Sequence, residues 1–132
     1  MARTTRWTDH GVLWTIDGVM HTRDALVFVE EAAQSPKLGD LKYFIWDVTG
    51  VTEHIDDEDD VELTSTYAAS LELYNRHIIG TLIANTPLMV ALSEEYLRTM
   101  KANDTPWEMK IFNDMEEGNK WLESKLSIPI KL

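Results

Sequence analysis

The alternation of strand-like and helix-like segments is the feature that most constrains the fold of this 132-residue chain. Two short strands are predicted first, at 3–8 and 12–19, with the turn residues Asp9, His10 and Gly11 between them. Helical and strand patterns then alternate to the end, giving the order ββαβαβαβα. Strands that are separated by a helix pair in parallel through right-handed crossovers. The sequence therefore predicts an α/β domain with a mixed, mostly parallel sheet and helices packed on it.

The predicted elements have boundary signals of known physical origin. Thr22 is predicted to cap a helix that ends before Pro36, because a threonine hydroxyl can accept a hydrogen bond from a free amide of the first turn. The segment 41–48 is apolar on both faces up to Asp47, which is typical of a strand buried inside a parallel sheet. The later elements are predicted as a helix at 57–74, a strand at 77–84, a helix beginning at Pro87, a strand at 107–112 and a helix capped by Asp114. We find no linker and no internal repeat, so residues 1–132 are expected to form a single domain.

Two of the predicted helices carry a stripe of residues that should face the sheet. The stripe of the helix at 57–74 consists of Val61, Thr64, Ala68 and Leu71. That of the helix beginning at Pro87 consists of Leu88, Leu92, Tyr96 and Met100. Because residues three and four apart lie on one side of a helix, we expect both stripes to be buried.

Composition and charge exclude several classes of protein. The chain has no cysteine, which rules out a disulfide scaffold, a cysteine zinc site and thiol catalysis. Its net charge is −11, so phosphate backbones and anionic lipid headgroups are repelled and nucleic-acid binding is not expected. There is no secretory signal and no run of about 20 apolar residues that would span a membrane. We therefore expect a soluble, cytoplasmic protein.

Three short patches carry a resemblance to a known family. The segment 46–51 (WDVTGV) matches the pattern of an aspartate, an apolar residue, a hydroxyl residue, glycine and valine at the end of a strand. The second patch is the strand at 77–84, which ends in Asn85 and Thr86, and the third is 110–122 (KIFNDMEEGNKWL). Together with the element order, these patches resemble the SpoIIAA-like family of STAS domains, the fold of anti-sigma-factor antagonists. The resemblance implies a non-enzymatic regulatory or protein-interaction module.

One feature of the switchable antagonists is missing from this chain. In the switchable antagonists, a phosphorylatable serine lies within a D-S-[ST]-G run. This serine begins the helix after the strand that corresponds to the one ending at 46–51 here. The corresponding residues here are Ile55, Asp56, Asp57 and Glu58, with neither a hydroxyl nor a glycine. The resemblance therefore implies a module without the phosphoserine switch. We hypothesise that it contacts a protein partner through the acidic segment 47–60, and particularly through Asp56 and Asp57.

The run of acidic residues at 56–60, with Glu62, allows two interpretations. Negative side chains in the first turn of a helix complement the helix dipole, each by about 0.3–1 kcal/mol. Alternatively, Asp56, Asp57 and Asp60 would hold a hard cation, with His54 nearby. The glycine-containing pattern of a calcium loop is absent, so we assign no metal site.

Polar residues at the ends of the predicted parallel strands form a second set of candidates. In open α/β sheets, ligands bind outside the carboxyl ends of the strands. The candidates for partner or ligand binding at this edge are Asp47, Thr49, Asn85, Thr86 and Asn113. The alternative is that such residues only cap helices and terminate strands.

Aromatic and methionine residues support a second function, which the resemblance also implies: a carrier or sensor of a small lipophilic ligand. Trp7 and Trp107 lie at the boundaries of predicted strands and not in their middle, and methionine adapts to varied apolar surfaces. With them, an apolar pocket or a homodimer interface would use Met89, Met100, Met109 and Met115. The alternative is ordinary core packing. The helix beginning at Pro87 is the predicted lid of the pocket, with Leu88, Met89, Leu92 and Tyr96.

Catalytic motifs are absent from the sequence, and no cofactor is expected. There is no nucleophile elbow, no phosphate-binding loop and no dinucleotide-binding glycine pattern. The four histidines are far apart in sequence. An acid–base enzyme that uses Asp47 and His77 is a remote alternative.

Overall fold

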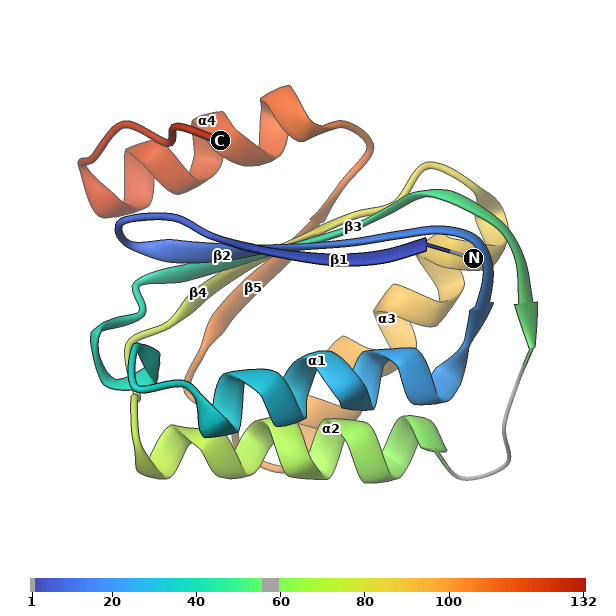
Figure 1. Cartoon of the computed structure of the whole chain (residues 1–132), viewed down its shortest axis with the longest axis horizontal. Helices are drawn as coiled ribbons and strands as arrows, with labels where there is room; N and C mark the ends of the chain where they lie inside the picture. The colour runs from blue at the N-terminus through green and yellow to red at the C-terminus, as the bar shows by residue number, and fades with distance from the viewer. Residues whose placement is uncertain (1, 56–59) are drawn as a thin grey trace.

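The computed structural model describes residues 2–55 and 60–132, which form one five-stranded sheet flanked by helices (Figure 1). The strands lie side by side in chain order, and the first is antiparallel to the second while the remaining pairs are parallel. They are β1 (Ala2–Trp7), β2 (Gly11–His21), β3 (Tyr43–Ile55), β4 (Ile79–Ile83) and β5 (Glu108–Phe112). The predicted order of elements and the mostly parallel sheet are confirmed.

The helices lie on both faces of the sheet. Three of them cover one face, and α4 (Met115–Leu126) covers the other (Figure 1). The three are α1 (Thr22–Gln34), α2 (Asp60–Ser70) and α3 (Pro87–Ala102). Side chains of β3 alternate between the two faces, so Phe44 and Trp46 belong to the core on the α1–α3 side, whereas Tyr43 and Ile45 pack on the α4 side. This explains why the strand is apolar on both faces.

Strand β3 is longer than predicted, because β2 continues beside it. The prediction ended this strand at Val48, but β3 runs to Ile55, which pairs with His21 at the end of β2. The added pairing contains register shifts, and Gly18 at one of them has a φ of 80°, a conformation that favours glycine. At Gly50, a Cβ atom would meet the carboxylate of Asp17, so a larger residue there would require that exposed side chain to move. Thr49 and Gly50 therefore lie within a strand and not in a turn.

The N-cap of α1 differs from the prediction. His21 is the N-cap, and Thr22 is the first helical residue. Asp24 reaches back and accepts a hydrogen bond from the His21 amide at 2.8 Å, while its other oxygen binds Arg3 at 2.7 Å. The Thr22 hydroxyl lies 3.1 Å from Nε2 of His54 instead. The buried Asp24 carboxylate thus accepts the hydrogen bond of the His21 amide at the start of α1, in place of a cap by Thr22.

The boundaries of α2 and the inner face of α3 also need correction. Helix α2 ends at Ser70 and is followed by a 3₁₀ turn, Leu71–Leu73, whereas the prediction continued to 74; its predicted start at 57 lies outside the described residues. Of its predicted inner face, Thr64, Ala68 and Leu71 are buried, and the side chain of Val61 is outside the described part. On α3, Leu88 is 51% exposed because the inward stripe begins one residue later; that stripe comprises Met89, Leu92, Tyr96 and Met100.

The predicted caps of the last two helices are confirmed. The Thr86 hydroxyl accepts a hydrogen bond from the Met89 amide at 3.3 Å, and the Asp114 carboxylate accepts one from the Glu117 amide at 2.8 Å. Pro87 occupies the first turn of α3, where its missing amide hydrogen costs nothing.

Removing the cap of α4 is expected to destabilise the protein measurably. In the Asp114→Ala variant, the Glu117 amide loses its acceptor, and the free energy of unfolding should fall by about 1 kcal/mol in urea titrations. Asp114→Asn should retain most of the stability, because an asparagine oxygen can also accept the bond. The control is Glu116→Ala, which changes an exposed acidic residue in the same turn. An equal loss in Asp114→Ala and Glu116→Ala would show that charge, and not the cap, matters.

Candidate functional site

An apolar cavity lies between the sheet and the three helices α1–α3. The volume of the cavity, measured as the space that the centre of a water molecule can occupy, is about 70 Å³. The sheet contributes Trp14, Phe44, Trp46 and Leu82; α1 contributes Ala25, Val29 and Ala32; α2 contributes Thr64, Ser65 and Ala68; α3 contributes Tyr96, Leu97 and Met100. About 10–15 Å³ of such space holds one water molecule, so the cavity accepts only a few heavy atoms in this conformation.

A connected series of aromatic rings forms the wall on the sheet side. The rings of Trp14 and Phe44 are 5.6 Å apart, and Phe44 is in turn 6.2 Å from Trp107. The ring of Trp46 is 6.2 Å from that of Tyr96 on α3. Such contacts hold large side chains in fixed positions, so the wall is preorganised for an apolar guest.

Two hydroxyl groups on α2 and one indole nitrogen are buried in this cavity without a partner. The side-chain oxygens of Thr64 and Ser65 and the Nε1 atom of Trp14 find no hydrogen-bond partner among the described residues. The three residues are only 3%, 0% and 7% exposed, respectively. An unsatisfied buried polar group costs about 1–3 kcal/mol, so these atoms are the polar groups of the cavity to which a guest or a buried water could bind.

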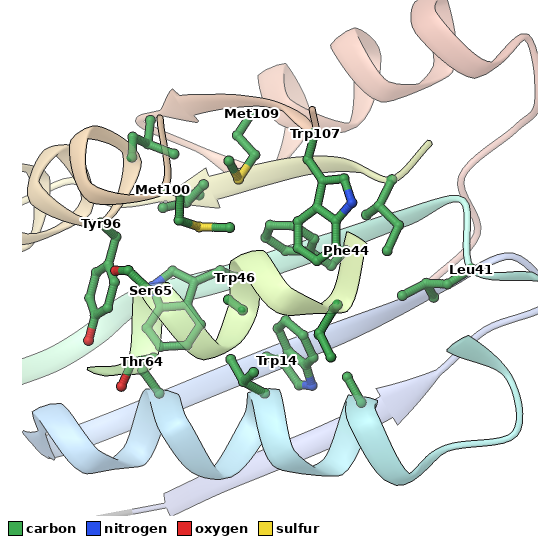
Figure 2. A pocket seen from close by; sticks show the side chains of 18 of the residues that line it. Trp14, Leu41, Phe44, Trp46, Thr64, Ser65, Tyr96, Met100, Trp107 and Met109 are labelled. Atoms are coloured by element: carbon green, nitrogen blue, oxygen red, sulfur yellow. The ribbon is translucent and has the colours of Figure 1, made fainter. Parts of the chain in front are cut away.

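Figure 2 shows that the cavity has two chemically different ends. Thr64 and Ser65 lie toward the same end as Tyr96, whereas Trp107 and Met109 lie toward the other. The Nε1 atom of Trp107 already donates a hydrogen bond to the backbone oxygen of Asn75 at 2.8 Å. One end therefore offers the hydroxyls of Thr64 and Ser65, whereas the described side chains around Trp107 are mostly apolar, with the unpartnered Nε1 of Trp14 as a further donor in the cavity.

The structure brings some of the predicted apolar residues to this cavity and leaves others elsewhere. Tyr96, Met100, Met109 and Trp107 line it, as the pocket hypothesis expected. Three others lie outside the described lining: Met89 is in the core on the same side of the sheet, Met115 at the start of α4 is partly buried against the core of the other face, and Trp7 lies at the edge of the core under Lys37. These three residues serve packing.

The polar residues predicted at the strand ends lie near the same edge of the sheet, where β3, β4 and β5 are in register, and their role in binding stays a prediction. Asp47 pairs with Ile83, the last residue of β4, so it is level with the end of that strand although it lies inside β3. Its carboxylate accepts hydrogen bonds from the Thr49 amide at 3.0 Å and from the Thr49 hydroxyl at 2.7 Å. Thr86 caps α3, and two asparagines are exposed, namely Asn85 and Asn113. The described lining of the cavity includes none of these five residues.

The remaining candidates are separated from the cavity or from each other. His77 precedes the start of β4, whereas Asp47 is level with its end, a separation of roughly 20 Å along the strand. The described structure therefore does not bring the proposed acid–base pair together, and the enzyme alternative stays a remote prediction. Asp56 and Asp57 lie outside the described residues. Among the described side chains, those of 3–55 and 63–132, no three histidine, aspartate or glutamate side chains cluster as a metal site would require.

Sequence reasoning missed most of the residues that build the cavity. Trp14, Phe44 and Trp46 were assigned to the core or to a buried strand, and Ser65 was given no role. The available signal was on α2, where Thr64 was already placed on the inner face. Two adjacent hydroxyl residues on the inward side of a helix are unusual for a core. They indicate that hydrogen-bonding groups are needed at that position.

Comparisons with known proteins agree with this architecture. No protein-family model matches the chain, and no curated protein is significantly similar to it in sequence. Among solved structures, it matches an uncharacterized protein of the DUF3478 family from Shewanella loihica PV-4, whose fold is described as SpoIIAA-like. The TM-score is 0.50, and the match covers 92% of each chain at 16% sequence identity.

The chain has a SpoIIAA-like fold. At this level of identity, the likeness concerns the fold alone, because unrelated functions are built on shared folds. The SpoIIAA-like fold accounts for the sheet order and for the placement of the helices on its faces. In the described part of the chain, no helix is long and apolar enough to cross a membrane.

Proposed function

We propose that this protein is a non-enzymatic carrier or sensor of a small lipophilic ligand, which it holds in the cavity between the sheet and α1–α3. The observation that carries the proposal is the apolar cavity itself, set within the main core and walled by aromatic rings. Protein cores are normally packed as densely as organic crystals. A void of this size costs on the order of 1–2 kcal/mol in lost packing, and an apolar guest would restore the contacts.

Entry of a ligand requires that a helix move, and α2 is the best candidate. The residues Thr64, Ser65 and Ala68 of α2 line the cavity, and α2 packs against both α1 and α3. The lid predicted from the sequence was α3, which also supplies three lining residues, Tyr96, Leu97 and Met100, but points Leu88 to solvent. We therefore transfer the role of cover from α3 to α2.

The regulatory or protein-interaction function stays a prediction. It depends on the segment 47–60, and Asp56 and Asp57 lie outside the described residues. Charge reversal at these two positions and at Asp60 should abolish a salt-sensitive partner contact in a pull-down experiment. A partner that remained bound to the reversed variant would remove this alternative.

Native mass spectrometry of gently purified, tag-free protein tests the carrier proposal directly. We expect excess mass in the native spectrum that leaves on denaturation, because a ligand held by apolar contacts is released when the fold opens. The released compound can then be identified by its own mass. Identical native and denatured masses, together with no uptake of added lipophilic compounds, would refute the proposal.

A further inference from the structure

We infer that the ligand carries a neutral oxygen-bearing head, such as a ketone, an ester or an alcohol, which binds to Thr64 and Ser65 while its apolar body extends toward Trp107. This inference rests on the proposed function, and it adds the chemical class and the orientation of the ligand. Its basis is the pair of free hydroxyl groups at one end of the cavity (Figure 2).

The hydroxyls of Thr64 and Ser65 on α2 differ in their hydrogen bonding from the hydroxyls of α3. A serine or threonine inside a helix usually donates its proton to the carbonyl oxygen four residues earlier. On α3, Ser93 donates to the backbone oxygen of Met89 at 2.7 Å, and Thr99 donates to that of Glu95 at 2.9 Å. Thr64 and Ser65 make no such bond with any described residue. Their protons are therefore available to an acceptor inside the cavity.

The head is inferred to be neutral because no described residue of the lining could balance a charge. Of the described residues that line it, none is charged. A carboxylate or an ammonium group would lose its hydration there without gaining a counter-ion, which is strongly unfavourable. A carbonyl or hydroxyl oxygen needs only hydrogen-bond donors, and both hydroxyls supply them.

The opposite end of the cavity fixes the orientation. Its indole nitrogen, Nε1 of Trp107, already donates to the backbone oxygen of Asn75, so Trp107 makes no polar demand on a ligand. The unpartnered Nε1 of Trp14 offers the cavity one further donor, against the two hydroxyls at the α2 end. The neighbouring side chains are apolar, among them Phe44, Leu41 and Met109. The hydrocarbon part of the ligand therefore lies against these residues, with the oxygen at the α2 end.

A pair of isosteric compounds tests the inference. The probes are 2-hexanone and 2-methyl-1-hexene, in which a methylene group replaces the ketone oxygen, and binding is followed by the fluorescence of Trp14, Trp46 and Trp107 at the wall. In the Thr64→Val, Ser65→Ala double variant, the affinity for the ketone should fall about fivefold to tenfold, as expected for lost hydrogen bonds. The affinity for the alkene should stay unchanged or rise.

The controls separate the head-group inference from the proposed function. Ser93→Ala removes a hydroxyl that is already bonded within α3, so it should leave both affinities unchanged. The single variants Thr64→Val and Ser65→Ala, checked by circular dichroism, replace the double variant if it does not fold. If both probes bind and the variants do not weaken ketone binding, the hydroxyls bind a buried water molecule and not the ligand. The inference then fails, while the carrier proposal stands. If neither probe binds to the unmodified protein, both fail.

Discussion

Replacing Ala68 with leucine is expected to lower the affinity for lipophilic ligands by at least about tenfold, which corresponds to about 1.4 kcal/mol. Ala68 is a buried residue of α2 whose side chain borders the cavity. Three additional carbon atoms at this position would occupy space that the ligand needs. Because they fill a void rather than displace packed atoms, the folded state should gain about 0.5–2 kcal/mol.

The Ala68→Leu experiment has a matched control on the same helix. Thr66 is exposed, so Thr66→Leu adds an apolar side chain to α2 without entering the cavity. Titration of both variants with 2-methyl-1-hexene, followed by tryptophan fluorescence, gives the affinities, and thermal unfolding gives the stabilities. Full binding by Ala68→Leu would mean that the ligand does not occupy this cavity, and the proposed function would then lose its structural basis.

Truncation of Phe28 to alanine is expected to cause a large loss of stability, about 3–5 kcal/mol. This side chain of α1 is fully buried, with 0% exposure. Its ring stacks on that of Trp14 at 5.5 Å and lies T-shaped to that of Trp46 at 5.7 Å, so it helps to hold two residues of the cavity wall in place. Removing the ring deletes both aromatic contacts and leaves a second void next to the first.

Urea unfolding measures this loss, and ligand binding shows its consequence. We expect Phe28→Ala to accept bulkier apolar ligands than the unmodified protein, since the new void adjoins the cavity. The control is Phe112→Ala on the other face, where the Phe112 ring contacts Trp121 of α4 at 5.6 Å. That variant should lose stability without any change in ligand size. A loss below about 1 kcal/mol in Phe28→Ala would show that the aromatic wall is not supported as we describe.

These results would also separate the function of the chain from its fold. A SpoIIAA-like fold is shared with the Shewanella loihica protein at 16% identity, and the fold alone does not assign a ligand. The carrier proposal depends instead on the volume and the lining of one cavity. It is therefore open to refutation by changes at Ala68 or Phe28 that leave the sheet order intact.

The sequence by itself determined the features that depend on neighbouring residues. The two-sided apolar pattern of 43–46 placed β3 inside the sheet, and Thr86 and Asp114 marked the starts of α3 and α4. Alternation of strands and helices then determined the parallel pairing and the order of elements. Such signals extend over a few residues, so periodicity and capping chemistry are sufficient to recognise them.

Only the tertiary structure decided the length of β3 and the location of the site. The strand continues to Ile55 because β2 supplies a partner there, which no local pattern of β3 reveals. The cavity exists because side chains from β2, β3, α1, α2 and α3 together leave a volume unfilled. Likewise, the hydroxyls of Thr64 and Ser65 are free because α2 and the residues facing them offer no acceptor among the described residues. Volume and hydrogen-bond satisfaction are sums over residues far apart in the sequence, so they become known only when the chain is folded.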